Sequence, residues 1–283
     1  MIILENVSYT YNRGRPDVCH ALHDVSLEIP DGSITAVIGH TGSGKSTLIQ
    51  LLNGIEKPDS GRVLVNGTEV TAKDTDMRAL RFRVGMVMQY PEYQLFEETV
   101  ERDIAFGPGN MGLGESEIKE RVFRAAELVG LSGEELKKSP FELSGGQKRR
   151  AAIAGVIAME PEVLVMDEPA AGLDPKGRSA VFELIRTLHL KRPDMIIIFV
   201  SHSMEDVAAT AERVIVMNNG SAVMNDETGR VFSRGDELKT IGLDVPQMAV
   251  LCSRLRKAGF NIPEGIYTVE AAVENLKRVL IND

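Results

Sequence analysis

A glycine-rich segment between an apolar run and a helix-like stretch constrains the fold of this 283-residue chain more than any other feature. Residues 39–46 read Gly-His-Thr-Gly-Ser-Gly-Lys-Ser and match the pattern G-x-x-x-x-G-K-[ST]. The apolar residues 34–38 precede this segment, and residues 46–53 have helical character. Glycines let a backbone wrap around a phosphate chain, and a helix N-terminus adds about half a positive charge. The segment therefore predicts a strand, a phosphate-binding loop and a helix within an α/β fold.

Two side chains of this loop suit particular parts of a nucleotide. Lys45 is placed to reach the β- and γ-phosphates, and Ser46 is placed to bind Mg²⁺. A chance glycine-rich turn is the alternative, because the pattern should arise in about one chain in a hundred of this size. The strand before the loop and the helix after it argue against that alternative.

Two later runs, residues 163–166 and 195–200, are continuously apolar, as are strands buried on both faces of a parallel sheet. Each run ends in polar residues, and ligands of open α/β sheets bind at the carboxyl ends of strands. Asp167 would hold Mg²⁺, Glu168 would orient or deprotonate an attacking water, and His202 would hydrogen-bond a γ-phosphate. An acidic strand end and an ordinary loop histidine are the alternatives.

A second glycine pair lies in residues 143–147, Leu-Ser-Gly-Gly-Gln, directly before a helix-like stretch. Ser144, Gly145, Gly146 and Gln147 would form a second anion-binding helix N-terminus. One nucleotide has only one phosphate chain, so a second anion site suggests service to a nucleotide bound to another subunit. An ordinary helix cap with a flexible turn is the alternative.

Local patterns outside these motifs predict hairpins early in the chain and helices later. Residues 31–32 (Asp-Gly) and 66–67 (Asn-Gly) each follow a β-like run and are typical of hairpin turns. Apolar residues recur at helical spacing over residues 115–131. In the tail, Pro246 and Thr268 predict the starts of two amphipathic helices.

Composition excludes several classes of protein. The chain is 43% hydrophobic and 26% charged, which excludes a wholly disordered chain. Its formal net charge of −9 disfavours a protein that coats nucleic acid. Cys19 and Cys252 lie far apart, so neither a disulfide framework nor a cysteine metal site is expected. No apolar run approaches the roughly 20 residues of a membrane span, and residues 1–5 lack the pattern of a secretory signal.

Taken together, the ordered motifs resemble those of the ATP-binding subunits of ABC transporters, over residues 1–229. The matching segments are the Walker A loop (39–47), the Q-loop glutamine (Gln89), the family signature (143–147), the Walker B strand (163–168), the D-loop (171–174) and the switch histidine (His202). The resemblance implies an α/β fold with a P-loop NTPase (RecA-like) core. An antiparallel β subdomain, an inserted α-helical subdomain at about residues 90–150 and a small, mainly helical C-terminal extension at 230–283 would complete it.

The resemblance also implies a role for each site residue, with ATP and Mg²⁺ as ligands. Catalytic roles fall to Glu168, His202 and Gln89, and Mg²⁺ would be held by Ser46, Gln89 and Asp167. The adenine would stack on Tyr11. The phosphates would be bound by Gly39, His40, Thr41, Gly42, Ser43, Gly44, Lys45, Ser46 and Thr47, and in trans by Ser144, Gly145, Gly146 and Gln147. One departure from the family is Ala170, where relatives commonly have threonine.

A narrower resemblance is to the ATPases of energy-coupling factor (ECF) transporters. It is carried by residues 89–100, Gln-Tyr-Pro-Glu-Tyr-Gln-Leu-Phe-Glu-Glu-Thr-Val, and by the shorter segments 105–108, 139–142 and 158–161. Residues 39–42 and 241–244 are most similar to the second of the two ATPases in that system.

This resemblance implies an ATP-hydrolysing subunit of an importer. Two ATPase subunits, as a heterodimer or a homodimer, would close head to tail on two MgATP molecules. Their reopening would move a transmembrane scaffold that carries a substrate-binding membrane subunit for a vitamin or a transition-metal ion. The chain would lie at the cytoplasmic face of the membrane as a peripheral subunit, would bind no nucleic acid, and would use residues 230–283 as a dimerisation element.

Three other interpretations remain from the sequence. A soluble ABC-type ATPase of DNA repair or translation would usually need tandem cassettes or a long coiled coil. A P-loop kinase for a small molecule would not need residues 143–147. A subunit that mainly supplies one interface, with a weak site of its own, is disfavoured by the intact Lys45, Asp167, Glu168 and His202.

Overall fold

The central element of the fold is a six-stranded sheet in which every strand but one runs parallel. The computed structural model describes residues 1–281 of the chain. The strands, in their order across the sheet, are β10 (Ser221–Glu227), β9 (Arg213–Asn218), β3 (Ile34–Ile38), β8 (Ile196–Val200), β7 (Val163–Asp167) and β6 (Val84–Val87). Only β10 is antiparallel to its neighbour. The two apolar runs predicted to be buried parallel strands are β7 and β8, which lie side by side.

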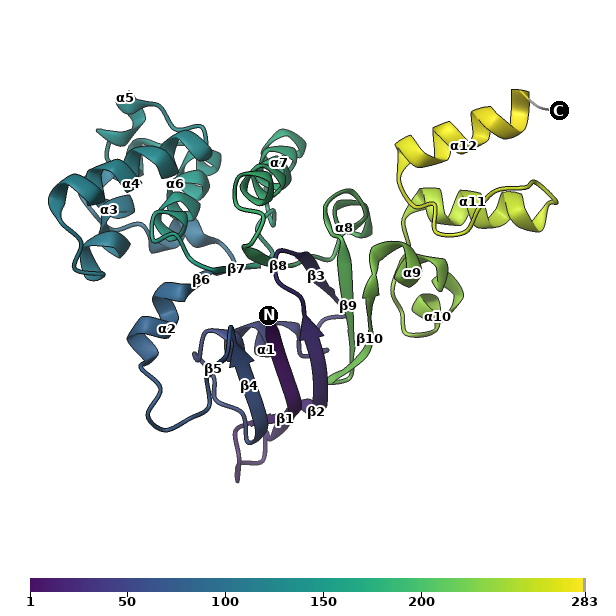
Figure 1. The fold of residues 1–283 in the computed structure, drawn as a ribbon, viewed down its shortest axis with the longest axis horizontal. Coiled ribbons are helices and arrows are strands. Elements are labelled where there is room, and N and C mark those ends of the chain that lie inside the picture. Colours follow the sequence, from purple (N-terminus) through teal and green to yellow (C-terminus); the bar gives the residue numbers. More distant parts are fainter. Residues whose placement is uncertain (282–283) are drawn as a thin grey trace.

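A second sheet of four antiparallel strands packs against one face of the first (Figure 1). Its strands, in order, are β2 (Cys19–Ile29), β1 (Ile2–Tyr11), β4 (Ser60–Val65) and β5 (Thr68–Glu69). Between the sheets lies α1 (Lys45–Leu52), the helix that follows the glycine-rich loop. Leu48, Ile49 and Leu52 of α1 share one hydrophobic cluster with residues of both sheets. Burial on both sides therefore holds the start of α1 in place.

One of the two predicted hairpins is confirmed and the other is wrong. Asn66 and Gly67 have positive φ values of 46° and 76° and join β4 to β5 in a two-residue turn. The turn at residues 31–32 instead carries the chain from β2 in one sheet to β3 in the other. Contacts with distant strands decide this: β3 is buried along its whole length and pairs with β8 and β9, where an apolar strand is most stable.

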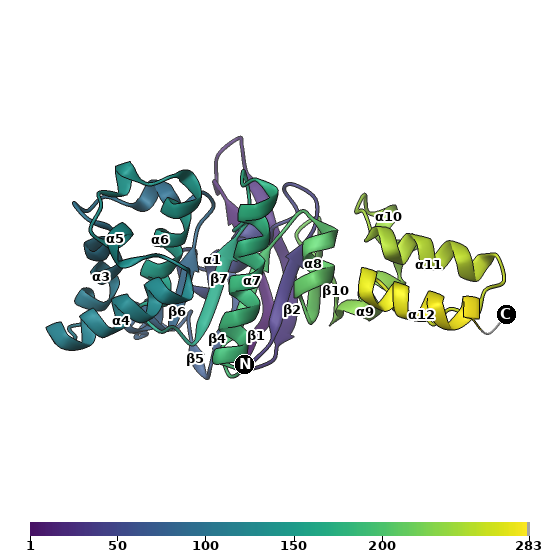
Figure 2. The same cartoon turned by 90° about the horizontal axis from the view of Figure 1, so that it is seen from above.

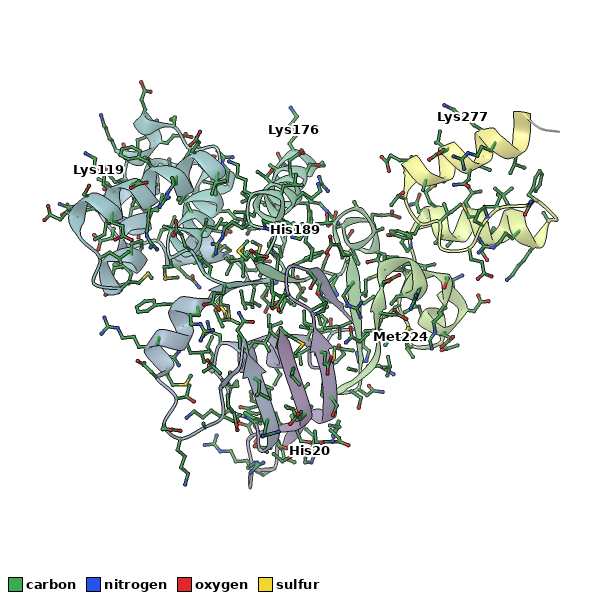
Figure 3. All side chains as sticks on the ribbon, in the orientation of Figure 1. His20, Lys119, Lys176, His189, Met224 and Lys277 are labelled. Carbon is green, nitrogen blue, oxygen red and sulfur yellow. The ribbon has the colours of Figure 1, made fainter. Side chains whose placement is uncertain are left out.

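Helices cover the other face of the six-stranded sheet and form an insertion beside it (Figure 2). The sheet face is covered by α7 (Pro175–Lys191) and α8 (Met204–Thr210), whose apolar residues pack on β8. A short helix, α2 (Met77–Arg83), leads into β6. The insertion between β6 and β7 comprises the 3-10 turns η1 (Pro91–Gln94) and η2 (Pro140–Glu142) and the helices α3 (Val100–Asn110), α4 (Glu115–Leu128), α5 (Gly133–Leu136) and α6 (Gly145–Ile157). In Figure 3, Lys119 of α4 and Lys176 of α7 point outward from these helices.

The C-terminal part of the chain has a small core of its own. It comprises α9 (Thr228–Ser233), α10 (Gly235–Thr240), α11 (Gln247–Lys257) and α12 (Val269–Ile281), which extend to one side in Figure 1. Cys252, Ile262, Ile266 and Ala272 form the buried cluster there. Both predicted helix starts are confirmed: Pro246 directly precedes α11, and the Thr268 hydroxyl accepts from the Ala271 amide at 3.3 Å. Within residues 1–281, no helix is both long and apolar enough to cross a membrane.

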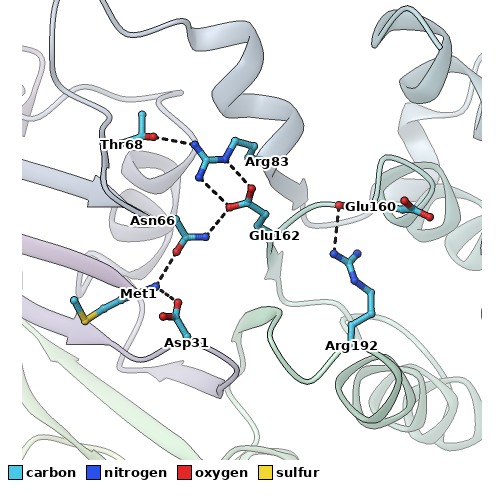
Figure 4. Close-up of polar contacts among 8 residues, drawn as sticks. All are labelled: Met1, Asp31, Asn66, Thr68, Arg83, Glu160, Glu162 and Arg192. Carbon is cyan, nitrogen blue, oxygen red and sulfur yellow. Dashed lines mark hydrogen bonds and ion pairs between the residues drawn. The ribbon is translucent and has the colours of Figure 1, made fainter.

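A polar network centred on Glu162 ties the two sheets together at the end opposite the glycine-rich loop (Figure 4). Arg83 donates to both carboxylate oxygens of Glu162, at 3.0 and 2.9 Å, and Asn66 donates at 2.7 Å. The amino group of Met1 donates to Asn66 Oδ1 at 2.7 Å. The Arg83 hydrogen bonds hold the pKa of Glu162 below its usual value, although burial opposes them. The network therefore joins the start of β7 to the β4–β5 turn and to the start of β1.

We expect the substitution Glu162→Gln to lower the free energy of unfolding at pH 7 by about 1 kcal/mol or less, because the ion pair is partly exposed and screened. A lowered carboxyl pKa stabilises the fold above the unfolded pKa, and that contribution is lost as the pH falls through the folded pKa. The stability gap between wild type and variant should therefore narrow towards pH 4. Urea unfolding from pH 7 to pH 4 measures this gap, and a gap independent of pH would contradict the role given to the Glu162 charge.

Candidate functional site

The residues singled out in the sequence converge on one edge of the six-stranded sheet. The neighbouring strands β3, β8, β7 and β6 run parallel, so their carboxyl ends meet at the same edge. The glycine-rich loop follows β3, Asp167 ends β7 with Glu168 directly after it, and His202 and Gln89 follow β8 and β6. Four segments that are far apart in the sequence thus bring their polar side chains to one place.

The loop at residues 39–44 has a backbone that only glycine can adopt at two points. Gly39 has φ 155°, and a Cβ there would lie 2.4 Å from the Met217 carbonyl oxygen. Gly44 has φ 99°, and its Cβ would lie 2.5 Å from the Ala21 carbonyl oxygen. The Ser43 hydroxyl is buried and has no hydrogen-bond partner within the described chain. The first amides of α1 lack acceptors within the helix, so the loop forms a cradle of donors that fits a phosphate group.

Lys45 lies at the first position of α1 and is only 6% exposed. Its ammonium group donates to the carbonyl oxygens of Gly39, at 2.9 Å, and His40, at 3.0 Å. Burial lowers the pKa of Lys45, and the charges of Glu168 and Asp167 oppose that shift. The side chain is therefore folded over the loop, where phosphate oxygens can replace the two carbonyls as acceptors.

Asp167 is the acidic group beside Ser46 and is 8% exposed. Burial raises the pKa of Asp167, and the neighbouring charge of Glu168 adds to that shift. The Ser46 hydroxyl, Lys45 and His202 oppose it. A hydroxyl and a carboxylate in this position are oxygen ligands of the kind that Mg²⁺ prefers. The donor set therefore fits a magnesium ion next to the phosphate cradle.

Glu168 lies at the centre of a hydrogen-bonded group from three strands. Its Oε1 atom lies 2.7 Å from His202 Nε2, and its Oε2 atom accepts from Gln89 Nε2 at 3.3 Å. The backbone of Glu168 has φ 48°, a left-handed conformation that is uncommon for a non-glycine residue. Its carbonyl accepts from the Ala171 amide at 3.0 Å, so a tight turn directs the carboxylate. Backbone strain of this kind often accompanies functional sites.

Tyr11 lies at the end of β1, beside the loop. Its hydroxyl is 3.2 Å from Thr47 Oγ1 and 3.4 Å from Gln50 Oε1, both on α1. The ring packs edge to face on Tyr9, with centroids 4.7 Å apart. Tyr11 therefore lies next to the helix that carries Lys45 and Ser46.

The second glycine pair begins α6, in the inserted helices. Ser144 caps the helix: its hydroxyl accepts from the Gln147 amide at 3.4 Å, and the Gln147 side chain accepts from the Ser144 amide at 2.8 Å. A Cβ added at Gly145 or Gly146 would meet no heavy atom within 4 Å, and neither residue has a positive φ. Nothing in the described chain therefore requires glycine there. No hydrogen bond joins residues 144–147 to residues 39–47 within the described chain.

The structure also reveals polar residues that the sequence did not single out. Arg149 of α6 is buried and pairs with Glu92 of η1. Arg178 of α7 pairs with Asp206 of α8, with the Arg178 Nε and Asp206 Oδ2 atoms 2.8 Å apart. Both pairs flank the edge that carries Glu168 and His202. Glu92 lies within residues 89–100, but nothing in that segment predicts its partner. Arg149, Arg178 and Asp206 lie outside the quoted motifs, so no local sequence signal identifies them.

Comparisons with known proteins agree with this arrangement. A family model described as ABC transporter matches residues 22–171. The chain is 55% identical over 281 residues to the energy-coupling factor transporter ATP-binding protein EcfA2 of Clostridioides difficile (strain 630). The alignment covers 99% of this chain and 97% of the relative. It is 53% identical over 282 residues to the protein of the same name from Clostridium tetani. That alignment covers 99% of this chain and 98% of the relative.

Two solved structures have a similar fold. The first is cbiO1 from Clostridium perfringens, described as part of the ABC transporter complex cbiONQ; it superposes with a TM-score of 0.75 at 36% identity, over 89% of this chain and 98% of its own. The second is a dimeric post-hydrolysis state of the ATP-binding cassette MJ0796 bound to ADP and Pi, with a TM-score of 0.71 at 26% identity, over 81% of this chain and 99% of its own. The predicted fold class and the predicted family are confirmed by these likenesses.

Proposed function

Because this chain belongs to the ABC transporter family, and within it to the energy-coupling factor transporter ATP-binding proteins, we propose that it binds and hydrolyses MgATP to drive an ECF importer. The convergence of the phosphate cradle, Asp167, Glu168, His202 and Gln89 on one sheet edge carries the proposal. The DNA-repair, translation and kinase alternatives find no support in the reported relatives, which match this chain over nearly their whole length.

The site residues divide the chemistry between them. The loop at residues 39–47 wraps the phosphate chain, Lys45 neutralises the β- and γ-phosphates, and Tyr11 stacks on the adenine. Ser46, Asp167 and Gln89 hold Mg²⁺, which neutralises charge on the phosphate oxygens when it is bound. Glu168 orients the attacking water and accepts its proton, and His202 holds the Glu168 carboxylate in place.

The signature residues of α6 serve the nucleotide of a second ATPase subunit. Gly145 and Gly146 have open space where a Cβ would lie, which fits a surface that a ligand approaches closely from outside the chain. The Ser144 hydroxyl and the first amides of α6 then face the γ-phosphate bound in the partner's loop. Two subunits, identical or not, would therefore close head to tail on two MgATP molecules.

The remaining surfaces serve assembly. The chain lies at the cytoplasmic face of the membrane as a peripheral subunit and contacts a transmembrane scaffold, which works with a substrate-binding membrane subunit for a vitamin or a transition-metal ion. We assign the ATP-binding domain to residues 1–229 and the extension to residues 230–283. The helical subdomain, predicted at about 90–150, includes α6 and therefore runs on to Ile157. The exposed apolar residues Leu251, Val269 and Val273 support a contact between subunits through this extension.

We expect Glu168→Gln to lower ATP turnover by about 10²–10⁴-fold, since it removes the general base, while ATP binding persists. Turnover is measured in the transporter complex purified from membranes, and binding with a fluorescent ATP analogue. Glu162→Gln, the same change at the opposite end of β7, is the matched control and should keep normal turnover. Unchanged turnover in Glu168→Gln would remove the role given to this residue.

Gly145→Ala should leave the fold intact, or slightly stabilise it, because alanine favours helix over glycine by about 0.5–1 kcal/mol. Turnover in the complex should fall by about 10²-fold, the effect of displacing reacting groups by about 1 Å. Gly133→Ala is a matched control, because Gly133 also follows a capping serine, Ser132, and also has open space at its Cβ. Equal turnover in the two variants would argue against a ligand at the start of α6.

A further inference from the structure

Arg149 is the most completely buried charged residue in the described chain, at 2% exposure. It lies in α6, five positions after the capping Ser144, between Lys148 and Arg150. A buried guanidinium is unfavourable unless its donors are satisfied. The hydrogen-bond partners of Arg149 therefore show which parts of the chain its guanidinium holds together.

The first partner is Glu92, in the turn η1 that follows Gln89. Arg149 Nε donates to Glu92 Oε2 at 2.9 Å, and Nη2 donates to Oε1 at 2.7 Å, so the pair is bidentate. Burial alone would raise the pKa of Glu92, but hydrogen bonds from Arg149 and from the backbone outweigh it and lower the pKa. The guanidinium carbon also lies 5.8 Å from the ring centroid of Tyr90, which precedes η1.

The second set of partners is the backbone that follows Glu168. Arg149 Nη1 donates to the carbonyl of Pro169 at 3.3 Å and to the carbonyl of Ala171 at 2.5 Å. These carbonyls belong to the turn that the Ala171 amide closes onto Glu168. That turn sets the left-handed backbone of Glu168, and residues 171–174 continue directly from it.

We propose that Arg149 is a positioning residue for hydrolysis, whose guanidinium fixes the turn after Glu168 to Glu92 and thereby holds the Glu168 carboxylate in register with Gln89 and with α6. The proposal rests on the function proposed above. All three nitrogens of the guanidinium donate: Nε and Nη2 to the Glu92 carboxylate, and Nη1 to the turn after Glu168. A lysine ammonium cannot reproduce this planar arrangement.

The same contacts give α6 a mechanical link to the catalytic edge. The start of α6 carries Ser144 and Gly145, and its second turn carries Arg149. A shift of α6 relative to the sheet therefore pulls on the Pro169 and Ala171 carbonyls and displaces Glu168. A ligand that binds the signature residues and shifts α6 would therefore also move Glu168, the proposed general base.

A pair of apolar substitutions separates positioning from stability. Arg149→Met alone would leave the Glu92 carboxylate buried without its partner, and the chain would unfold more readily. The double variant Arg149→Met, Glu92→Met removes both charges, and such replacements of buried ion pairs often leave stability unchanged or improved. It still leaves the Pro169 and Ala171 carbonyls without their donor.

The experiment compares this double variant with wild type in the purified transporter complex. We expect a melting temperature lowered by only a few degrees, because two carbonyls lose their donor while the charges are removed as a pair. We expect an unchanged KM for ATP and a kcat lower by about 10²-fold, as expected for a misplaced catalytic group. Arg83→Met, Glu162→Met removes another bidentate pair, at the opposite end of β7, and should keep normal kcat. A double variant at residues 149 and 92 that is folded at the assay temperature and has normal kcat would overturn the proposal.

A second measurement keeps the proposal testable without hydrolysis. The Ala171 and Leu173 amides are hydrogen-bonded within the turn, to Glu168 and Ala170. Hydrogen exchange in a peptide covering residues 168–174 should become at least about tenfold faster in the double variant, because the turn loses its outer support. Unchanged exchange would refute the link whatever the turnover. A wild-type complex without ATP hydrolysis would instead refute the proposed function and leave the exchange result to decide on Arg149.

Discussion

The parallel pairing of β6, β7, β8 and β3 is the constraint on which the whole site depends. Because the strands are buried on both faces, between the second sheet with α1 and the helices α7 and α8, their order and direction are fixed by the two hydrophobic clusters. Parallel strands end at the same edge, so the side chains that follow them must meet there. The positions of Lys45, Asp167, Glu168, His202 and Gln89 are consequences of this packing.

Charge is concentrated at that edge in a chain whose overall charge is negative. The lowered pKa of Lys45 and the raised pKa of Asp167 both arise mainly from burial, and each charge opposes the shift of the other. A local site of this kind can bind an anionic nucleotide against the field of the whole chain. Glu168 has a left-handed backbone there, and Arg149 donates to the carbonyl of Ala171 in the turn that follows it. In the proposed mechanism, these two features hold the carboxylate that accepts the proton.

Much of the fold and of the site could be predicted from sequence because the signals are local. The glycines of residues 39–44, the continuously apolar strands and the capping serine of α6 each determine their own short segment. The hairpin predicted at residues 31–32 is wrong because the choice of sheet for β3 depends on strands more than 150 residues away. Arg149 could not be singled out, since Lys148, Arg149 and Arg150 look alike in sequence. Only the packing of α6 buries Arg149. The Lys148 Nζ atom instead lies 5.8 Å from the ring centroid of Phe141, which is exposed.

We propose that each nucleotide lies between the phosphate loop of one subunit and the signature helix of the other. The most direct test is photocleavage of the purified complex trapped with MgADP and orthovanadate. Vanadate bound at the γ-phosphate position cuts the backbone next to it when the sample is irradiated with ultraviolet light. We expect this chain to be cut both within residues 39–46 and within residues 144–147 in the complex, and only within residues 39–46 when it is isolated. Cleavage confined to residues 39–46 in the trapped complex would contradict a nucleotide site shared between subunits.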